Sequence, residues 1–263
     1  MKKLRSKIYL GVIMAFLYLP IIYLIAYSFN DGKTSVWKGF TLKWYEALFN
    51  DTQIINSLYN TLLVAVLASV IATILGTAAA IGIYNFKGGV RSAIQNVSNI
   101  PIINPEIVTG VSLMLLFTFA GTMLGFEMGF WTVLLAHIGF CTPYVILNVT
   151  PRIRRMDPSL YEAAQDLGCS PMQAFFKVVL HELMPGILSG FLISFTYSLD
   201  DFVITYFTRG SRFQTLPIQI YTMTHQRINP KANALSTLLF VAVMAILIIY
   251  NFASMRRSKE AAR

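Results

Sequence analysis

Residues 186–207 read GILSGFLISFTYSLDDFVITYF, an apolar run that contains two adjacent aspartates, Asp200 and Asp201. The run is long enough to cross a hydrocarbon core of about 30 Å, which needs roughly 20 apolar helical residues. An ionised carboxylate at that depth costs about 2.5 to 3.5 kcal/mol on insertion scales, so it needs a cavity, a partner or a cationic cargo. The run therefore predicts a membrane helix that takes part in transport.

The whole chain has the composition of an integral membrane protein. Hydrophobic residues make up 56% and charged residues 13% of its 263 residues, which is too apolar for an ordinary soluble domain. We expect one all-α transmembrane domain over residues 1–263, with a third acid, Glu106, interrupting its third span. The six predicted spans are approximately residues 8–29, 58–86, 97–119, 130–150, 186–207 and 235–253.

The distribution of Lys and Arg predicts the orientation of these spans. Of the 21 basic residues, fourteen fall on the side that carries both termini, and the cytoplasmic side of a membrane protein carries the excess. Both termini are therefore predicted to be cytoplasmic. The first apolar run is expected to stay in the protein as a span, because no small-residue cleavage site follows it. A nucleic-acid partner is not expected, since the basic residues are scattered over short loops.

The loop over residues 151–185 has the pattern of two short helices. Asp157 is suited to cap a first helix that has Pro158 at its first position, and Gly168 is suited to end it. Ser170 repeats the start signal, and Gln173 three residues later fits a capping box. A second helix is expected to run to about Leu183 with one broad apolar face, which needs a protein or a membrane to cover it.

This loop also carries a family resemblance. Its residues Glu162, Ala163 and Ala164, then Gly168, resemble the conserved cytoplasmic loop of ABC-importer permease subunits. The rest of that pattern is Phe175, Val178, Leu180 and Pro185-Gly186. The resemblance implies the type I importer permease fold, in which the loop forms coupling helices that dock into a cytoplasmic ATPase. His181 stands where the family usually has proline, so we expect the second helix to continue further than usual. The alternative is that the loop is only an amphipathic connector.

The resemblance also implies the partners of the chain. They are a second homologous permease, a dimer of cytoplasmic ATP-binding subunits and an extracellular or periplasmic binding protein. No Walker A sequence is present, so ATP and Mg are expected to bind the partner ATPase, and this chain is expected to hold no cofactor. No catalytic residue and no metal site are expected, because the three histidines fall in different regions. Of these, His137 is interpreted as a hydrogen bond between helices. Cys141 and Cys169 are not expected to pair.

The cargo is predicted from the intramembrane acids. The strings Ser198-Leu199-Asp200-Asp201-Phe202-Val203 and Asn104-Pro105-Glu106-Ile107-Val108 resemble the spermidine/putrescine permeases, specifically the second of their two permease subunits. The predicted substrate pathway comprises Asp200, Asp201, Glu106, Ser198 and Trp44. Adjacent helical residues point about 100° apart, so one aspartate can line the pathway while the other binds a neighbouring helix. The resemblance places the chain in a bacterial cytoplasmic membrane as a multi-pass protein.

Several alternatives remain open from the residues alone. The acids can instead be hydrogen-bonding groups between helices in an importer for another solute. Trp44 can be an anchor at the membrane surface. An ion-coupled secondary carrier would use the same acids to bind protons or Na⁺, although the docking loop and the lack of inverted halves disfavour it. A membrane enzyme is a further alternative.

Overall fold

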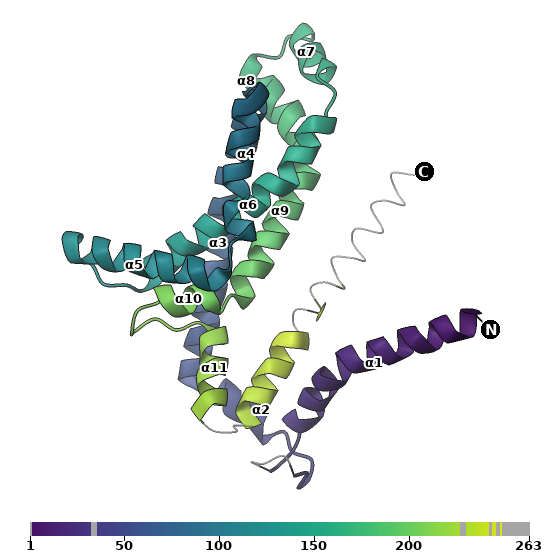
Figure 1. The fold of residues 1–263 in the computed structure, drawn as a ribbon, viewed down its shortest axis with the longest axis vertical. Helices are drawn as coiled ribbons and strands as arrows, with labels where there is room; N and C mark the ends of the chain where they lie inside the picture. The colour runs from purple at the N-terminus through teal and green to yellow at the C-terminus, as the bar shows by residue number, and fades with distance from the viewer. Residues whose placement is uncertain (1, 33–35, 227–229, 242–243, 246–247, 249–263) are drawn as a thin grey trace. The chain divides into compact units, whose positions relative to one another are not determined.

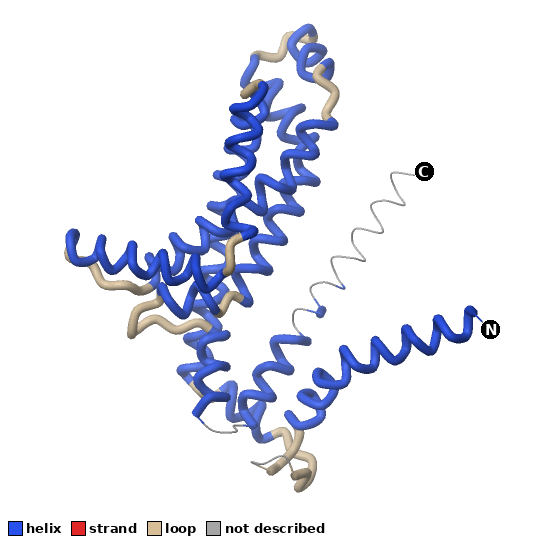
Figure 2. The backbone as a smooth tube through the Cα atoms, viewed as in Figure 1, coloured by secondary structure: helices blue, strands red, loops and turns tan. Residues whose placement is uncertain are grey.

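A computed structural model describes residues 2–32, 36–226, 230–241, 244–245 and 248, most of which are helical (Figures 1 and 2). The predicted all-α class is confirmed, and the one strand-like feature of the described residues is an isolated antiparallel bridge between Asn30 and Phe40. The labelled helices are α1 (Lys2–Ser28), α2 (Lys43–Phe49), α3 (Thr52–Asn85), α4 (Gly88–Ile103), α5 (Glu106–Leu124), α6 (Phe130–Arg155), α7 (Ser159–Asp166), α8 (Pro171–Ala174), η1 (Phe175–Val179), α9 (Leu180–Asp200), α10 (Val203–Thr208) and α11 (Leu216–Gln226).

Within the part of the chain that the structure describes, five helical segments are long and apolar enough to cross a bilayer. They are Tyr9–Ser28, Thr52–Asn85, Glu106–Leu124, Phe130–Arg155 and Pro171–Asp200. The sixth predicted span, residues 235–253, lies partly outside the described residues, so the sixth crossing stays a prediction.

The chain forms two compact units, one of Met1–Asn56 with Gln219–Arg263 and the other of Ser57–Ile218. In the first unit, Trp44 of α2 anchors the loop that follows α1. Its indole Nε1 donates a hydrogen bond of 2.8 Å to the backbone carbonyl of Asn30, and the residue is only 8% exposed. Lys43 Nζ lies 4.7 Å from the centre of the Trp44 ring and pairs with Asp31. These contacts hold the loop against α2.

The core of the second unit is built where α3, α6 and α9 approach one another closely. A Cβ added at Gly76 of α3 would lie 2.6 Å from the Cβ of Val145 on α6. One added at Gly190 of α9 would lie 3.1 Å from the Cα of the same valine. Small residues permit such approaches between membrane helices, and Val145 is fully buried between them. In Figure 1, α6 and α9 run side by side, and α7 and α8 lie at one end of the pair.

The third predicted span is divided in two. α4 ends at Ile103 and α5 begins at Glu106, with Asn104 in an extended conformation between them (ψ 136°). Pro105 accounts for the break, because proline disfavours the helical conformation of the preceding residue and has no N–H to donate. The expectation that Glu106 interrupts a continuous span from residue 97 is therefore wrong. Glu106 is the first residue of α5, where the helix dipole favours a carboxylate.

The fifth predicted span is divided as well. α9 begins at Leu180 and ends at Asp200, and α10 begins at Val203 after an extended Asp201 (ψ 124°). The two aspartates thus lie at a helix break and not inside a continuous helix over residues 186–207. Membrane proteins tolerate such irregular backbone where it is buried in protein or lines a cavity.

The predicted loop helices form with the predicted caps. Asp157 Oδ1 accepts the backbone N–H of Ser159 at 2.9 Å, and α7 begins at that serine. Gly168 has the left-handed φ of 89° that ends the turn after α7. Ser170 and Gln173 form the reciprocal capping box of α8, as predicted.

The helix that starts after Ser170 does not end near Leu183. It passes through the π-helical turn η1, where the N–H of Leu180 bonds to the carbonyl of Phe175, and continues as α9. The helix runs through His181, and the expectation that it extends further than is usual in the family stays a prediction.

Candidate functional site

Asp201 fixes the start of α10. Its carboxylate accepts the backbone N–H groups of Ile204 (3.3 Å) and Thr205 (2.8 Å) and the hydroxyl of Thr205 (2.7 Å). The first turn of a helix leaves its N–H groups without partners inside the helix, and an aspartate side chain satisfies them. The Asp201 side chain is only 6% exposed. This aspartate therefore acts as a buried helix cap.

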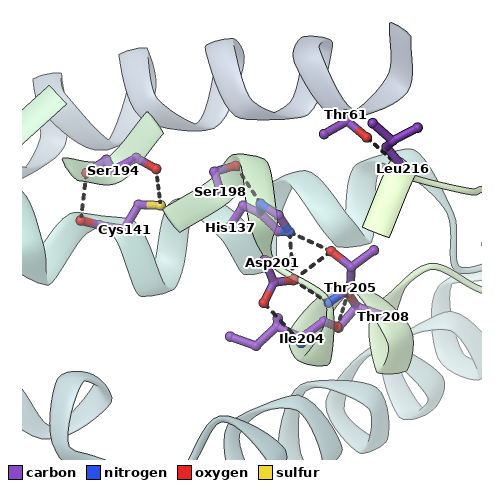
Figure 3. Close-up of polar contacts among 10 residues, drawn as sticks. All are labelled: Thr61, His137, Cys141, Ser194, Ser198, Asp201, Ile204, Thr205, Thr208 and Leu216. Atoms are coloured by element: carbon purple, nitrogen blue, oxygen red, sulfur yellow. Dashed lines mark hydrogen bonds and ion pairs between the residues drawn. The ribbon is translucent and has the colours of Figure 1, made fainter. Parts of the chain in front are cut away.

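His137 of α6 joins the end of α9 to the start of α10, as Figure 3 shows. Its Nδ1 lies 2.7 Å from Ser198 Oγ, and its Nε2 lies 2.9 Å from Thr205 Oγ1 and 3.4 Å from Asp201 Oδ2. The ring is 1% exposed. The interpretation of His137 as a hydrogen bond between helices is confirmed, and it spans three helices.

The hydrogen-bond pattern assigns the proton on this ring. The hydroxyl of Thr205 donates to Asp201, so its oxygen is free to accept, and Nε2 of His137 must be the donor. In the neutral ring, Nδ1 then accepts the hydroxyl of Ser198. Every polar side-chain atom of this buried cluster has a partner in that state, which is what a polar network in a low-dielectric interior requires.

Ser198, His137 and Asp201 are the residue types of a hydrolase triad. They meet because α6 packs against the end of α9. A triad serine must be reached by its substrate, whereas Ser198 is 3% exposed and inside the helix packing. The cluster is therefore a structural latch, which we call the His137 latch (His137, Ser198, Asp201 and Thr205). Ser198 contributes to it from a buried position.

Asp200 and Glu106 line one cavity beside the two helix breaks. Both carboxylate residues are exposed, in contrast to Asp201. The cavity has a volume of about 240 Å³. Aromatic residues line it together with the acids, namely Phe140, Tyr144, Tyr197 and Phe202.

The charges in this cavity repel one another. Glu106 and Asp201 both place negative charge near Asp200, and no Lys or Arg is among the residues that line the cavity. A cation in the cavity would relieve this repulsion, and aromatic faces attract ammonium groups by about 0.5 to 2 kcal/mol. The arrangement can therefore hold an organic cation away from bulk water.

Sequence reasoning did not recognise that three residues around this site belong together. His137, Phe140 and Tyr144 follow one another along α6 at spacings of three and four residues, which places them on one helix face. This spacing was available in the sequence. The sequence did not show where this face packs, because no local feature indicates that it meets the end of α9.

Comparison with known proteins decides the family. Residues 72–257 match the family described as binding-protein-dependent transport system inner membrane component. The chain belongs to this family. It is 37% identical to the spermidine/putrescine transport system permease protein PotC of Haemophilus influenzae, over 92% of this chain and 93% of that protein. It is also 38% identical to the putrescine transport system permease protein PotI of Escherichia coli, over 94% and 90% of the two chains.

Solved structures share the fold of this permease. A chain of a bacterial ABC transporter involved in the import of the acidic polysaccharide alginate matches with a TM-score of 0.71 at 14% identity, over 96% of this chain and 95% of that one. A chain of the MetNI methionine ABC transporter matches with a TM-score of 0.60 at 18% identity, over 79% and 96%. The predicted importer permease fold is confirmed. Because one of these neighbours belongs to an importer of an acidic polymer, the fold does not determine the charge of the cargo.

The remaining predicted residues of the permease are not among those that line the cavity. Glu162 and Ala163 are exposed on α7, whereas Ala164 is buried and Gly168 ends the turn. Their role in coupling stays a prediction. Trp44 belongs to the first unit, where its N–H and one ring face are already engaged, and its role in the pathway also stays a prediction.

Proposed function

We propose that this permease is the membrane subunit of an ATP-driven importer that carries polyamines, such as spermidine and putrescine, into the cytoplasm. The observation that carries the proposal is the identity of 37% to 38% with polyamine permeases over more than nine-tenths of this chain. The acid-lined, aromatic cavity supports it independently, because its chemistry fits a protonated amine. The family match favours an importer subunit over an ion-coupled carrier or a membrane enzyme.

In this proposal the two aspartates have different roles. Asp200 and Glu106 offset the loss of hydration of the cargo amines while these are away from water. Asp201 and Ser198 act indirectly, since the His137 latch holds the helix break that presents Asp200. A transporter must also release its cargo, and exposed carboxylates attract the cargo without the high affinity of a closed site.

The partners follow from the family. A second homologous permease completes the pathway, and residues Glu162, Ala163, Ala164 and Gly168 help the loop dock onto a dimer of cytoplasmic ATP-binding subunits. That dimer binds ATP and Mg and supplies the energy. A periplasmic or extracellular binding protein delivers the polyamine, as one alginate transporter structure with its periplasmic protein illustrates for that system. The complex lies in a bacterial cytoplasmic membrane with both termini of this chain in the cytoplasm.

The test of the cargo is uptake of labelled spermidine by cells that lack their own polyamine import and express this chain with its partners. We expect ATP-dependent uptake, and a loss of at least about tenfold in Asp200→Asn at equal membrane abundance, because the charge that offsets amine desolvation is gone. Asp201→Asn is expected to reduce abundance as well as uptake. If the complex assembles and hydrolyses ATP but never takes up polyamine, the importer stands and the polyamine is discarded.

The test of the docking loop is a pair of variants in the same cells. Glu162→Gln and Gly168→Leu are expected to abolish uptake while the chain still inserts, since leucine disfavours the left-handed φ of Gly168. Uptake that survives unchanged in both variants would show that the loop is only a connector.

A further inference from the structure

Two tyrosines from different helices form a wall of the acidic cavity. Tyr144 of α6 and Tyr197 of α9 stack with their ring centroids 4.5 Å apart and their planes 21° apart. Both line the same cavity as Asp200 and Glu106. Stacked rings cover only one face of each other, so the stack leaves the second face of the exposed Tyr197 ring for another contact, while the half-buried Tyr144 reaches the cavity as a lining residue. Tyr197 is 45% exposed, so its ring is not consumed by packing.

The two kinds of group in the cavity select different properties of a cation. Carboxylates alone attract any cation, including hydrated metal ions, which prefer oxygen ligands. An aromatic face adds attraction for an ammonium group and also contacts the methylene groups attached to it. Phe140 and Phe202 extend the apolar part of the lining. A cavity with both kinds of group therefore favours an alkyl-ammonium ion over an inorganic one.

We propose that the stacked rings of Tyr144 and Tyr197 are a specificity-determining wall, which binds the alkyl-ammonium groups of the cargo beside Asp200 and Glu106. This inference rests on the proposed function and adds the residues that recognise the organic part of the cargo. The ring faces, and not the tyrosine hydroxyls, provide the contact. The His137 latch holds the helix break that positions Asp200, and its member Asp201 is also among the residues that line the cavity.

The experiment compares ring-retaining with ring-removing substitutions in the complete transporter in proteoliposomes. The Tyr144→Phe/Tyr197→Phe pair keeps both faces, and the Tyr144→Leu/Tyr197→Leu pair removes both. Spermidine uptake and ATP hydrolysis are measured together at saturating spermidine-loaded binding protein. We expect the Phe pair to transport at the wild-type rate. The Leu pair should transport about 2- to 30-fold more slowly with ATP hydrolysis retained, so that more ATP is used per spermidine.

The outcomes separate this inference from the proposed function. If wild type itself takes up no spermidine, the proposed cargo fails and the wall fails with it. If wild type transports and the Leu pair transports equally well, the cargo stands and the wall is wrong. A Phe pair as slow as the Leu pair would assign the effect to the hydroxyls and would also overturn the proposal. Should the Leu pair fail to assemble, Tyr197→Leu alone decides the question, because removing this exposed ring leaves no buried cavity.

Discussion

The two ends of the α6–α9 pair are held together in different ways. At the α7–α8 end, the capping bonds join residues two or three positions apart, such as Asp157 with Ser159 and Ser170 with Gln173, and these groups are exposed. At the other end, His137 bonds to Ser198 and Thr205, which lie 61 and 68 positions away, inside the packing. The loop end can thus exchange outside contacts while keeping its own fold, whereas the break end depends on tertiary packing.

The largest expected effect that tests this contrast comes from the His137 latch. His137→Leu removes a partner of the buried Asp201 and leaves Ser198 unpaired, so we expect the free energy of unfolding to fall by about 3 to 5 kcal/mol. Thermal unfolding of the purified complex in detergent measures it. The matched variant at the loop end is Asp157→Ala, which removes an exposed cap and should change the midpoint only slightly. If the two variants lose equal amounts of unfolding free energy, the two ends are not stabilised in different ways.

A smaller effect is expected where the helices approach most closely. Gly76→Leu places a side chain against Val145 and should cost about 1 to 3 kcal/mol through overpacking, with reduced membrane abundance. Gly82→Leu is the control on the same helix, because a Cβ there meets nothing within 4 Å. Abundance and unfolding temperature are compared for the two variants. If Gly82→Leu is the more damaging, the close approach of α3 and α6 is not the constraint.

At the loop end, the capping box should behave as a local unit. Ser170→Ala is expected to cost about 1 kcal/mol in local stability of α8, since it removes a helix cap. Amide hydrogen exchange should speed up over residues 172–174 and stay unchanged around His137. Gln173→Ala should lower the local stability of α8 by less in the Ser170→Ala background than it does alone, because the two side chains cap the helix reciprocally. If amide exchange also becomes faster in α10, the two ends are energetically coupled and the capping box is not a local unit.

The smallest expected effect is a pH dependence confined to the loop. The N–H of Ser159 holds the pKa of the Asp157 carboxyl below its usual value of 3.8. A depressed pKa means that the cap contributes its full stability above pH 3.8 and loses it as pH falls through the lower folded value. Hydrogen exchange at the start of α7 should therefore accelerate in that acidic window beyond the intrinsic rate. Asp157→Asn should abolish this excess pH dependence, and an unchanged profile in that variant would exclude the cap as its source.

Sequence reasoning succeeded where the determining contacts are local. The caps at Asp157 and Ser170 and the turn at Gly168 depend on neighbouring residues, and they were predicted. It failed at the two helix breaks. Pro105 was visible in the sequence, but the apolar run on both sides of Asp201 concealed the second break.

The division of roles between the two aspartates could not be assigned from sequence either. A helix of uniform period places them about 100° apart but does not say which one meets His137. That answer depends on the packing of α6 against the end of α9, which brings together residues about sixty positions apart. The stacking of Tyr144 on Tyr197 beside the cavity was obscured for the same reason.

The π-helical turn Phe175–Val179 has a consequence for the length of this segment. A π turn closes over five residues where an α turn closes over four, so it accommodates one residue more than a regular helix between the same two ends. Removing a single residue there would let α8 and α9 form one uninterrupted α-helix. Because the π turn takes up that extra residue, the deletion would leave the face of α8, including Met172, pointing in the same direction relative to α9. An extra residue accommodated in a regular α-helix would instead rotate that face by about 100°. The π turn thus lets this segment carry one more residue while the loop keeps the direction in which it presents itself to a partner.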